Sequence, residues 1–435
     1  MTPAEYLRRR RRLVKAIGPQ SIVILPAASE RLRNRDVHYP FRQDSDFSYL
    51  TGFPEPDAWC VLVQKRKEGE FILFCRPRDP EREQWDGMRI GPEGAIKRFG
   101  ADQSHPMGAL DEEMPKLIEG CKRLYYPIGT NTDLDNRVMG WVRQVRAKAR
   151  SGTRAPEVLI DLGSILHEQR LKKSAAEIAI LRRAARISAQ AHLKLMRLCR
   201  PGLTEDRLAA EFRYRCALAG ASELAYPSIV AGGAHACVLH YIENAAELRD
   251  GDLVLVDAGC ELSGYASDIT RTFPVNGRFT PAQRQIYEWV LKAQQAALKR
   301  AIPGRRWNEP HEAALKVLTK GLVELGILDG DPKQLIKDEA YKPYYMHRTG
   351  HWLGMDVHDV GDYQRDGEWR KLEPGMVFTV EPGLYLPQIE AVPEEYRGIG
   401  VRIEDTVLIT EEGHEILSDA VPKDPEAIEQ LMQRG

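Results

Sequence analysis

Short apolar runs separated by turns fill the first third of the chain. Runs of this kind are typical of buried strands, and they predict strands at residues 22–25, 59–63 and 71–75. Apolar residues at helical spacing predict helices over residues 3–17, 92–99, 108–120 and 132–149. The pattern therefore predicts a mixed α/β domain with its own core over residues 1–168.

A different pattern begins after a basic stretch at residues 170–173. Ser174 and Glu177 form the S-x-x-E signature of a capping box, which marks the start of a helix. That helix ends at Pro201-Gly202, and the next runs from a cap at Thr204 to Gly220. A domain boundary is therefore expected within residues 165–173, with a second domain over residues 169–435.

The same order of elements returns about a hundred residues later. Thr280, Pro281 and Gln283 make another capped helix start with proline at the first helical position. This helix also ends at a Pro-Gly pair, residues 303–304, and a further helix is expected over residues 308–325. The repeated helix pair indicates an internal duplication.

Two acidic stretches support the duplication independently. Residues 251–259 and 375–383 each read glycine, an apolar run, an acid six positions on, and a second glycine two positions later. These acids are Asp257 and Glu381, and each is followed by an extended run with another acid, Asp268 and Glu404. Solvated acids at strand ends are the ordinary alternative, but two copies with one spacing favour a four-carboxylate pocket between the halves.

The chemistry of such a pocket points to metal ions. Converging carboxylates repel one another unless a cation lies between them, and four of them suit two divalent ions roughly 3.5–4 Å apart. His351, in a glycine-punctuated segment with His347 and His358, would complete the ligand set. Oxygen-rich ligation with one imidazole favours manganese or cobalt and is compatible with zinc. A dimetal centre of this kind is a hydrolytic device.

Composition narrows the class of protein. The chain has 435 residues, 43% of them hydrophobic and 29% charged, as in ordinary soluble globular proteins of two or three domains. A net charge of −1 gives no global field for nucleic acid or an anionic membrane, and no apolar run reaches the length of a membrane span. The seven cysteines include no C-x-x-C pair, which predicts free thiols and a cytoplasmic location.

Three features of the first domain allow two interpretations. The five arginines at residues 8–12 are interpreted as a solvated helix face, with Leu7 and Leu13 packed inward, in preference to a targeting or nucleic-acid arm. The charged and aromatic residues at 36–42, Asp36 among them, form either a surface loop or part of a site. Trp85 is either a packing residue or a substrate contact.

Four blocks of the second domain resemble the Xaa-Pro aminopeptidases, or aminopeptidase P. They read D-A-G-C-x-x-x-G-Y-x-x-D-I-T-R-T-F, H-x-x-x-H-W-L-G-x-D-V-H-D, V-E-P-G-L-Y and R-I-E-D, in this order, and residues 33–53 resemble the N-terminal domain of the same family. The resemblance implies an α+β protein, in which a creatinase-like N-terminal domain precedes a pseudo-twofold, duplicated pita-bread catalytic domain. Prolidase, methionine aminopeptidase and creatinase share this catalytic fold.

The resemblance also implies the metal ligands. Asp257 would bind one metal ion, His351 and Glu381 the other, and Asp268 and Glu404 would bridge the two. A bridging hydroxide would attack the carbonyl carbon before a proline at the second position of the peptide, with Glu381 as proton shuttle. The ions are expected to be manganese, with cobalt or zinc as alternatives.

Substrate contacts are implied in the same way. His240 and His358 would position the substrate and stabilise the oxyanion, and His347 would contact the proline side. Hydrogen bonds near the metals are expected from Tyr385 and Arg402. Further contacts are expected from Asp36 and Trp85, in their own or a neighbouring subunit of a homodimer or homotetramer.

One departure and one rival remain. Residues 231–235 read Ala-Gly-Gly-Ala-His where several relatives carry a Ser-Gly-Glu-Asn turn, so that His235 and Tyr226 are expected to shape the amino-side pocket differently. The rival activity is that of prolidase, an Xaa-Pro dipeptidase with the same ligands, which the His347-to-Trp352 motif disfavours. A non-catalytic binding module is disfavoured because all five ligands are present.

Overall fold

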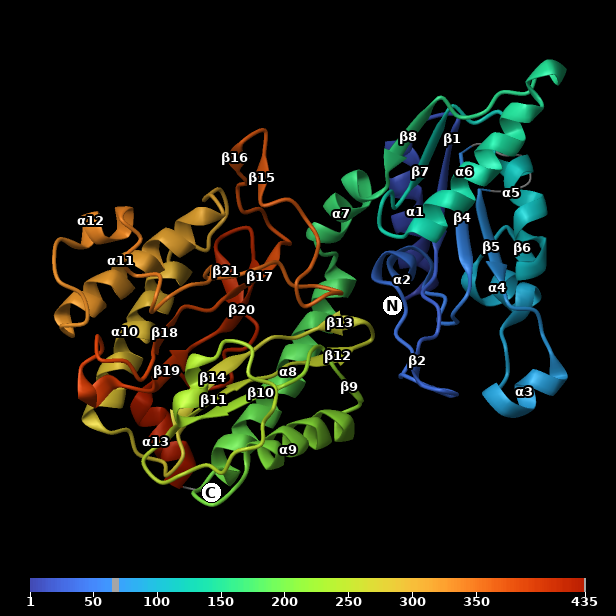
Figure 1. Ribbon diagram of the computed structural model, residues 1–435. Helices are drawn as coiled ribbons and strands as arrows, with labels where there is room; N and C mark the ends of the chain where they lie inside the picture. The colour runs from blue at the N-terminus through green and yellow to red at the C-terminus, as the bar shows by residue number, and fades with distance from the viewer. Residues whose placement is uncertain (65–69, 434–435) are drawn as a thin grey trace. The chain divides into compact units, whose positions relative to one another are not determined.

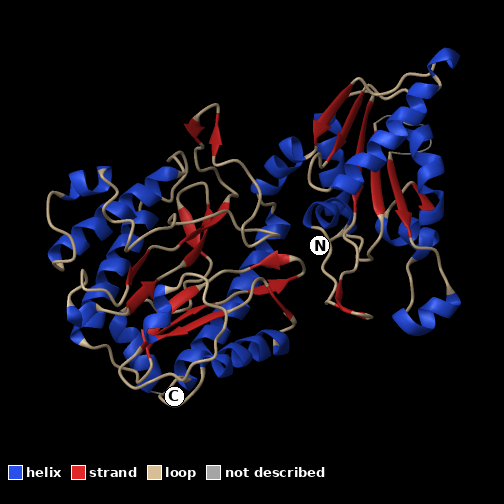
Figure 2. Cartoon of the chain, viewed as in Figure 1, coloured by secondary structure: helices blue, strands red, loops and turns tan. Residues whose placement is uncertain are grey.

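The chain folds into two compact units. The computed structural model describes residues 1–64 and 70–433, and the units are Met1–Arg170 and Leu171–Gly435. Each has a separate hydrophobic core, and both combine helices with strands (Figure 2). The sequence predicted the division between residues 168 and 169.

A six-stranded sheet forms the centre of the first unit, in the order β6-β5-β4-β1-β7-β8. Its strands are β1 (Ser21–Pro26), β4 (Trp59–Val63), β5 (Phe71–Cys75), β6 (Gln103–Pro106), β7 (Arg123–Tyr126) and β8 (Val158–Asp161). Strand β1 pairs antiparallel with β4 and parallel with β7, so the sheet is mixed. Strands β4 and β5 are buried along their whole length, which requires cover on both faces of the sheet.

Helices provide that cover. The helices of this unit are α1 (Pro3–Ile17), α2 (Ser45–Thr51), α3 (Pro80–Asp86), α4 (Gly91–Phe99), α5 (Leu110–Ile118), α6 (Thr132–Ala147) and α7 (Gly163–Leu171). Strands β2 (Leu32–Asn34) and β3 (Val37–His38) form a short hairpin. Helices α5 and α6 lie on one face of the sheet and α1 and α2 on the other (Figure 1). The pattern did not predict α2, α3 or α7.

The interpretation of the N-terminal arginines as a solvated face is wrong for two of them. Arg9 and Arg10 are only 2% and 5% exposed, whereas Leu7 is 40% exposed. The Arg9 guanidinium lies 4.0 Å from the centre of the Tyr49 ring, and that of Arg10 lies 4.0 Å from the centre of the Phe71 ring. Stacking on aromatic rings lets these two cations pack inside the unit.

The first half of the second unit begins with two helices and continues with strands. These are α8 (Ala175–Leu198), α9 (Glu205–Leu218), β9 (Glu223–Leu224), β10 (Ile229–Gly232), β11 (Leu253–Asp257), β12 (Cys260–Leu262), β13 (Tyr265–Ala266) and β14 (Thr270–Pro274). The predicted capping box between Ser174 and Glu177 is present at the start of α8.

The second half repeats this order. Its elements are α10 (Pro281–Leu298), α11 (Asn308–Glu324), α12 (Pro332–Lys337), β15 (Gln364–Arg365), β16 (Glu368–Trp369), β17 (Val377–Val380), β18 (Gly383–Leu386), β19 (Ile399–Arg402), β20 (Asp405–Ile409), β21 (His414–Ile416) and α13 (Pro425–Gln433). Thr280 and Gln283 form the second capping box, also as predicted.

Corresponding strand pairs form the centre of the two halves. Strand β11 pairs antiparallel with β14, and β17 pairs antiparallel with β20. A smaller hairpin is inserted after the first strand of each pair: β12–β13 in the first half and β18–β19 in the second. The four long helices flank these strands (Figure 1), and one hydrophobic core runs through both halves.

The extended run expected at residues 265–273 is interrupted. Ser263 and Gly264 have φ angles of +52° and +78°, and they turn the β12–β13 hairpin. The chain then passes Gly259, where a Cβ atom would lie 1.7 Å from the carbonyl oxygen of Ser267. This close approach separates β13 from β14 and leaves Asp268 between them. A period-2 pattern does not reveal such a break.

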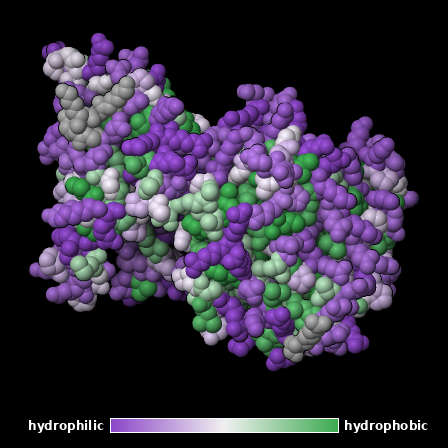
Figure 3. Space-filling model, turned by 180° about the vertical axis from the view of Figure 1, so that it is seen from behind, coloured by the Kyte–Doolittle hydropathy of each residue, from purple (hydrophilic) through white to green (hydrophobic). Residues whose placement is uncertain are grey.

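Membrane-spanning helices are not found in the described part of the chain, where no helix is both long and apolar enough to cross a bilayer. The face drawn in Figure 3 carries mainly hydrophilic side chains with hydrophobic ones between them.

Candidate metal centre

The paired strands of both halves end at the same place with their acidic residues. Asp257 is the last residue of β11, and Asp268 comes two residues before β14. Glu381 directly follows β17, and Glu404 directly precedes β20. The duplication therefore puts one acid before and one after each chain reversal, and all four line one cavity.

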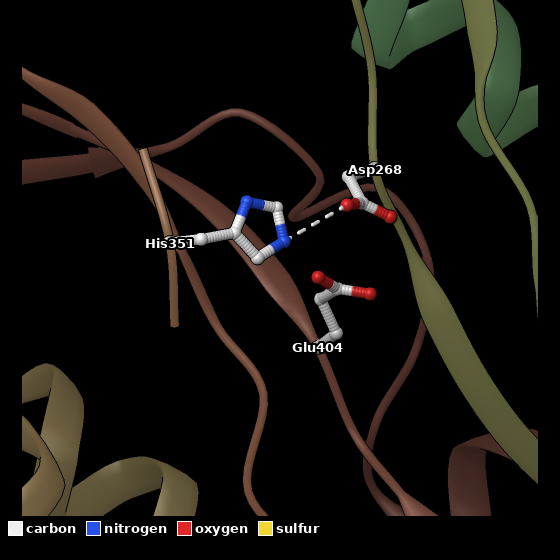
Figure 4. A group of neighbouring side chains, drawn as sticks. All are labelled: Asp268, His351 and Glu404. Atoms are coloured by element: carbon white, nitrogen blue, oxygen red, sulfur yellow. Dashed lines mark ion pairs between the residues drawn. The ribbon is translucent and has the colours of Figure 1, made fainter. Parts of the chain in front are cut away.

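Asp268, Glu404 and His351 form the tightest group. Each offers one ligand atom, and these atoms lie within 4.8 Å of one another. Figure 4 shows the three side chains pointing toward a common centre from three separate segments. Asp268 and Glu404 are 4% and 1% exposed. Buried carboxylates in this arrangement are typical of a site that binds a cation.

His351 is oriented for ligation by its own main chain. Its Nδ1 atom lies 3.0 Å from the carbonyl oxygen of Trp352 and donates to it, which leaves Nε2 as the free lone pair. Nε2 lies 3.4 Å from an oxygen of Asp268 and 3.5 Å from an oxygen of Glu381. The backbone N–H of His351 donates to the hydroxyl of Thr379.

Two donors hold Asp257 in place. The Nη2 atom of Arg402 lies 2.6 Å from one carboxylate oxygen, and the hydroxyl of Tyr226 lies 2.7 Å from the other. Tyr226 also contacts Asp268, so that one phenol ties the two aspartates together. Sequence reasoning placed Tyr226 at the amino-side pocket, and its position on the carboxylates could not be inferred from the motif.

Threonine hydroxyls serve the two glutamates. Thr270 Oγ1 donates to Glu404 at 2.7 Å, and Thr379 Oγ1 donates to Glu381 at 3.2 Å. Sequence reasoning missed both threonines. Their signal is weak, because a threonine in a strand is ordinary.

The electrostatics of the group favour a bound cation. Burial raises the pKa of Glu381 to about 7, and burial together with Asp268 raises the pKa of Glu404 well above its usual range. Burial lowers the pKa of His351, but its contact with Asp268 and the charge of Glu381 outweigh this effect and raise it to about 9. All three shifts favour the uptake of positive charge. Divalent cations would supply the same charge, so these residues fit a metal site.

A cavity of about 460 Å³ opens over these ligands. Imidazoles and apolar side chains share its wall with the acids. The lining residues include His240, His347, His358, Ile229, Leu239, Ile242, Val357, Tyr226 and Pro227. This combination of a few polar groups with apolar walls is typical of a small-molecule or peptide site.

One side of the cavity carries a fixed hydrogen-bonded row. His347 Nδ1 donates to the carbonyl oxygen of Arg348 at 2.7 Å, so its Nε2 accepts from the hydroxyl of Tyr385 at 2.8 Å. Tyr385 in turn accepts from Arg402 Nη1 at 3.0 Å. Burial and the nearby Arg402 charge lower the pKa of His347 to about 3, so this ring stays neutral.

The other predicted residues are less constrained. His358 lies with its ring centre 4.4 Å from that of His351, and burial and His351 lower its pKa. His235 does not line the cavity and contacts Glu205 instead. Asp36 and Trp85 belong to the first unit, where both are exposed, Trp85 by 86%. Trp85 is therefore not a packing residue of its unit, and its role toward a substrate stays a prediction.

Known proteins match this chain along its length. Residues 179–411 match the family model of metallopeptidase family M24, and residues 6–125 match that of the aminopeptidase P N-terminal domain. The chain is 46% identical to a Xaa-Pro aminopeptidase of Escherichia coli, over 98% of this chain and 97% of the relative.

Solved structures agree. Aminopeptidase PepP of Pseudomonas aeruginosa superimposes with a TM-score of 0.98 at 55% identity, covering 100% of this chain and 98% of the other. Zinc-substituted aminopeptidase P of E. coli in complex with product gives 0.97 at 45% identity, with 100% and 99% covered. The predicted fold class is confirmed. The chain belongs to metallopeptidase family M24, as a Xaa-Pro aminopeptidase with the family's N-terminal domain in front of the pita-bread unit.

Proposed function

We propose that this chain removes the N-terminal residue from peptides that have proline at the second position. The observation that carries this function is the convergence of five ligand-type side chains on the floor of an imidazole-lined cavity, in a chain matched along its length by Xaa-Pro aminopeptidases. The dipeptidase alternative is not favoured, because the relatives compared above are aminopeptidases.

Two divalent ions are the proposed cofactor. Asp257 would hold one, His351 and Glu381 the other, and Asp268 and Glu404 would be shared between them. Bound there, the ions would lower the pKa of water and polarise the scissile carbonyl. Manganese is proposed because oxygen ligands dominate the set. Cobalt and zinc are the alternatives, and a structural relative is a zinc-substituted enzyme.

Glu381 is the proposed proton carrier. Its Oε1 atom already accepts from Thr379, and the carboxylate lines the cavity floor beside His351. A carboxylate held in this position can take a proton from the attacking water and deliver it to the leaving nitrogen of proline. The prolyl nitrogen carries no hydrogen in the peptide bond, so this proton is needed for its departure.

The imidazoles of the cavity have two different proposed roles. Both ring nitrogens of His347 are occupied by Arg348 and Tyr385, so His347 can offer only its ring edge, which suits the apolar pyrrolidine ring. The rings of His240 and His358 have no hydrogen-bond partner within the described residues. These two histidines can therefore donate to a substrate carbonyl and to the oxyanion that forms from it.

Four further residues have proposed roles, and those of Asp36 and Trp85 rest on the resemblance alone. Arg402 and Tyr385 would keep the ligands and His347 in register. Asp36 and Trp85 are proposed to reach substrate from the first unit, in the same or a neighbouring subunit. We also propose that the units are the two domains predicted at residues 1–168 and 169–435, and that the protein forms a homodimer or homotetramer.

A cytoplasmic location is proposed from the cysteines. All seven are free, and six of them are buried. A chain that keeps reduced thiols in its core suits a reducing compartment.

A matched set of peptides tests the activity. The Mn²⁺-loaded protein is expected to release the first residue of an Xaa-Pro-Yaa-Yaa tetrapeptide, and to leave the same peptide with alanine in place of proline nearly intact. Cleavage of an Xaa-Pro dipeptide alone would reassign the chain as a dipeptidase. Cleavage of no peptide by metal-loaded protein would refute the proposal. Light scattering after size-exclusion chromatography tests the subunit number, since a monomer would contradict the proposed oligomer.

A further inference from the structure

The segment that carries His240 has little structure of its own. It follows the 3₁₀-helix η3 (Gly233–Cys237) and reaches β11 without a helix or strand between residues 238 and 252, all of them described. Leu239, His240 and Ile242 from this segment line the cavity, yet His240 is exposed and Ile242 is 56% exposed. Leu239 and Tyr241 pack partly against a small buried cluster, and Leu248 is fully buried. The side chains of His240 and Ile242 bury little, so a polar contact is needed to fix the chain around His240.

A buried carboxylate provides that contact. Glu205 is fully buried at the first residue of α9. Its Oε1 accepts from the N–H of Gly232 at 2.8 Å and from Nδ1 of His235 at 3.1 Å. Its Oε2 accepts from the hydroxyl of Tyr241 and from the N–H of Ala246, both at 2.8 Å. One carboxylate thus joins η3, the residue after His240 and Ala246 in the middle of the segment.

The surroundings are built for a carboxylate at this point. Four donors satisfy both oxygens, and the N-terminus of α9 favours a negative charge. A Cβ atom on Gly232 would lie 3.3 Å from Glu205 Oε1 and 2.8 Å from Leu248, so the glycine permits the close approach. The His235 and Tyr241 rings stack with their centres 4.4 Å apart. Burial and the hydrogen bond to Glu205 raise the pKa of Tyr241, which stays a donor.

A second set of side-chain hydrogen bonds lies further along the chain than His240. Asn244 accepts from the N–H of Val230 and donates to the carbonyl oxygen of Ser228, each at 2.8 Å. The side-chain hydrogen bond nearest to His240 is therefore that of Tyr241 with Glu205.

We propose that Glu205 is a positioning residue for the reaction, which acts through Tyr241 on the place of His240 in the cavity. It touches neither substrate nor the candidate metal ligands. The inference rests on the proposed function, because it takes His240 to be a substrate contact. His235 of the Ala-Gly-Gly-Ala-His stretch then helps to hold Glu205 in place, and it does not shape the substrate pocket directly.

A double-mutant cycle tests this inference. Glu205→Gln keeps the shape of the side chain but replaces one acceptor oxygen by a donor, so one of the two backbone N–H groups loses its partner. In the wild-type background, kcat/KM for the Xaa-Pro tetrapeptide is expected to fall about tenfold. In a His240→Ala background, Glu205→Gln is expected to have almost no further effect, because the group through which it acts is gone. Equal losses in both backgrounds would show a general structural role and overturn the proposal.

Two further variants complete the design. Asp206→Asn removes a charge from the same turn of α9 at an exposed position, and it is expected to leave kcat/KM unchanged. Tyr241→Phe removes the hydroxyl that donates to Glu205 and keeps the ring stack, so it tests the same link if Glu205→Gln fails to fold. It is expected to lower kcat/KM in the wild-type background and not in the His240→Ala background. Additive losses for Tyr241→Phe would likewise overturn the proposal.

Hydrogen exchange separates this inference from the proposed activity. Amides of residues 238–246 are expected to exchange at least about tenfold faster in Glu205→Gln than in the wild type, whereas amides of β17 and β20 exchange unchanged. Unchanged exchange at residues 238–246 would refute the positioning role, even in an active enzyme. Faster exchange there in Glu205→Gln, together with a wild-type protein that cleaves no Xaa-Pro peptide, would uphold the role of Glu205 in holding the segment and refute the proposed activity.

Discussion

The two halves of the second unit have the same strands but contribute different chemistry. The first half supplies two short acids, Asp257 and Asp268, whereas the second supplies Glu381, Glu404 and the only imidazole of the candidate ligand set, His351. One acid of each half is also held by a donor from the other half. Arg402 in the second half binds Asp257, and Thr270 in the first half binds Glu404.

Hydrogen bonds to main-chain carbonyl groups follow the same crossed pattern. The N–H of Glu404 donates to the carbonyl oxygen of Thr270 at 3.1 Å, and the hydroxyl of Thr406 donates to the carbonyl oxygen of Asp268 at 2.8 Å. Strands β14 and β20 therefore meet along a seam, here meaning the contacts of residues 268–272 with residues 402–406. The duplication accounts for a pair of acids in each half, and the contacts along the seam bring the two pairs together in one site.

The loss of a single carboxylate, from either half, is expected to have the largest effect on activity. Asp268→Ala and Glu404→Ala are each expected to lower kcat/KM by more than about 1,000-fold, or about 4 kcal/mol of transition-state stabilisation. The physical reason is that both acids approach the same imidazole, so neither half can complete the site alone. Peptide cleavage and metal content of the purified variants measure the effect.

The control for these variants is Asp419→Ala, at an exposed acid after β21, which is expected to retain full activity. Circular dichroism should show that all three variants are folded. Full activity in either ligand variant would contradict the shared role of Asp268 and Glu404.

A buried ion pair on the seam is the next largest contribution. Arg271 on β14 and Asp405 on β20 are both fully buried, and Nη2 lies 2.9 Å from Oδ1. Burial raises the pKa of Asp405, but Arg271 and Lys423 outweigh it and lower the pKa below its usual range. Arg271→Met leaves a buried carboxylate without its main partner, and is expected to cost about 3–5 kcal/mol of unfolding free energy.

Thermal unfolding would show this loss as a decrease of Tm by about 6–20 °C. The double variant Arg271→Met/Asp405→Leu is the control, and it should recover part of the loss because no unpaired charge stays buried. If the single variant unfolds at the wild-type temperature, the seam does not depend on this pair.

Two threonines test whether a hydrogen bond from the other half matters more to a glutamate than one from its own half. Thr270→Val removes the 2.7 Å hydrogen bond that Thr270, in the first half, donates to Glu404 in the second. The affinity for the metal is expected to fall about 10- to 100-fold. Thr379→Val removes the longer, 3.2 Å bond to Glu381 within the second half, and less than about tenfold is expected. Competition with a chelator measures both affinities. A larger loss for Thr379→Val would contradict the importance of the seam.

Local signals were enough to predict the frame of this unit. Both capping boxes and both helix pairs are where the sequence places them, because caps and helical periodicity act over a few residues. The acids could be predicted for the same reason, since the spacing from Gly251 to Asp257 recurs from Gly375 to Glu381. A repeated local pattern is visible without knowledge of the fold.

The donors could not be predicted from local signals. Thr270 and Glu404 are 134 positions apart, and Arg402 and Asp257 are 145 apart. No periodicity connects residues at such separations, and the strand register that joins them exists only after packing. The burial of Arg9 and Arg10 escaped prediction for a similar reason, because their aromatic partners lie on other elements.

An exposed ion pair between the halves is expected to contribute least to stability. Arg182 on α8 pairs with Glu415 on β21 at 2.5 and 2.8 Å, but the two side chains are 46% and 38% exposed. Water and salt screen such a pair, so Arg182→Ala is expected to cost only about 0.2–1 kcal/mol of unfolding free energy.

Thermal unfolding at low and high salt measures this cost. The cost of Arg182→Ala should shrink as the salt concentration rises, whereas the loss in Arg271→Met should not. A cost for Arg182→Ala close to that of Arg271→Met would mean that burial does not decide which contacts join the halves. The expected difference arises because Arg271 and Asp405 lack water as an alternative partner, and Arg182 and Glu415 do not.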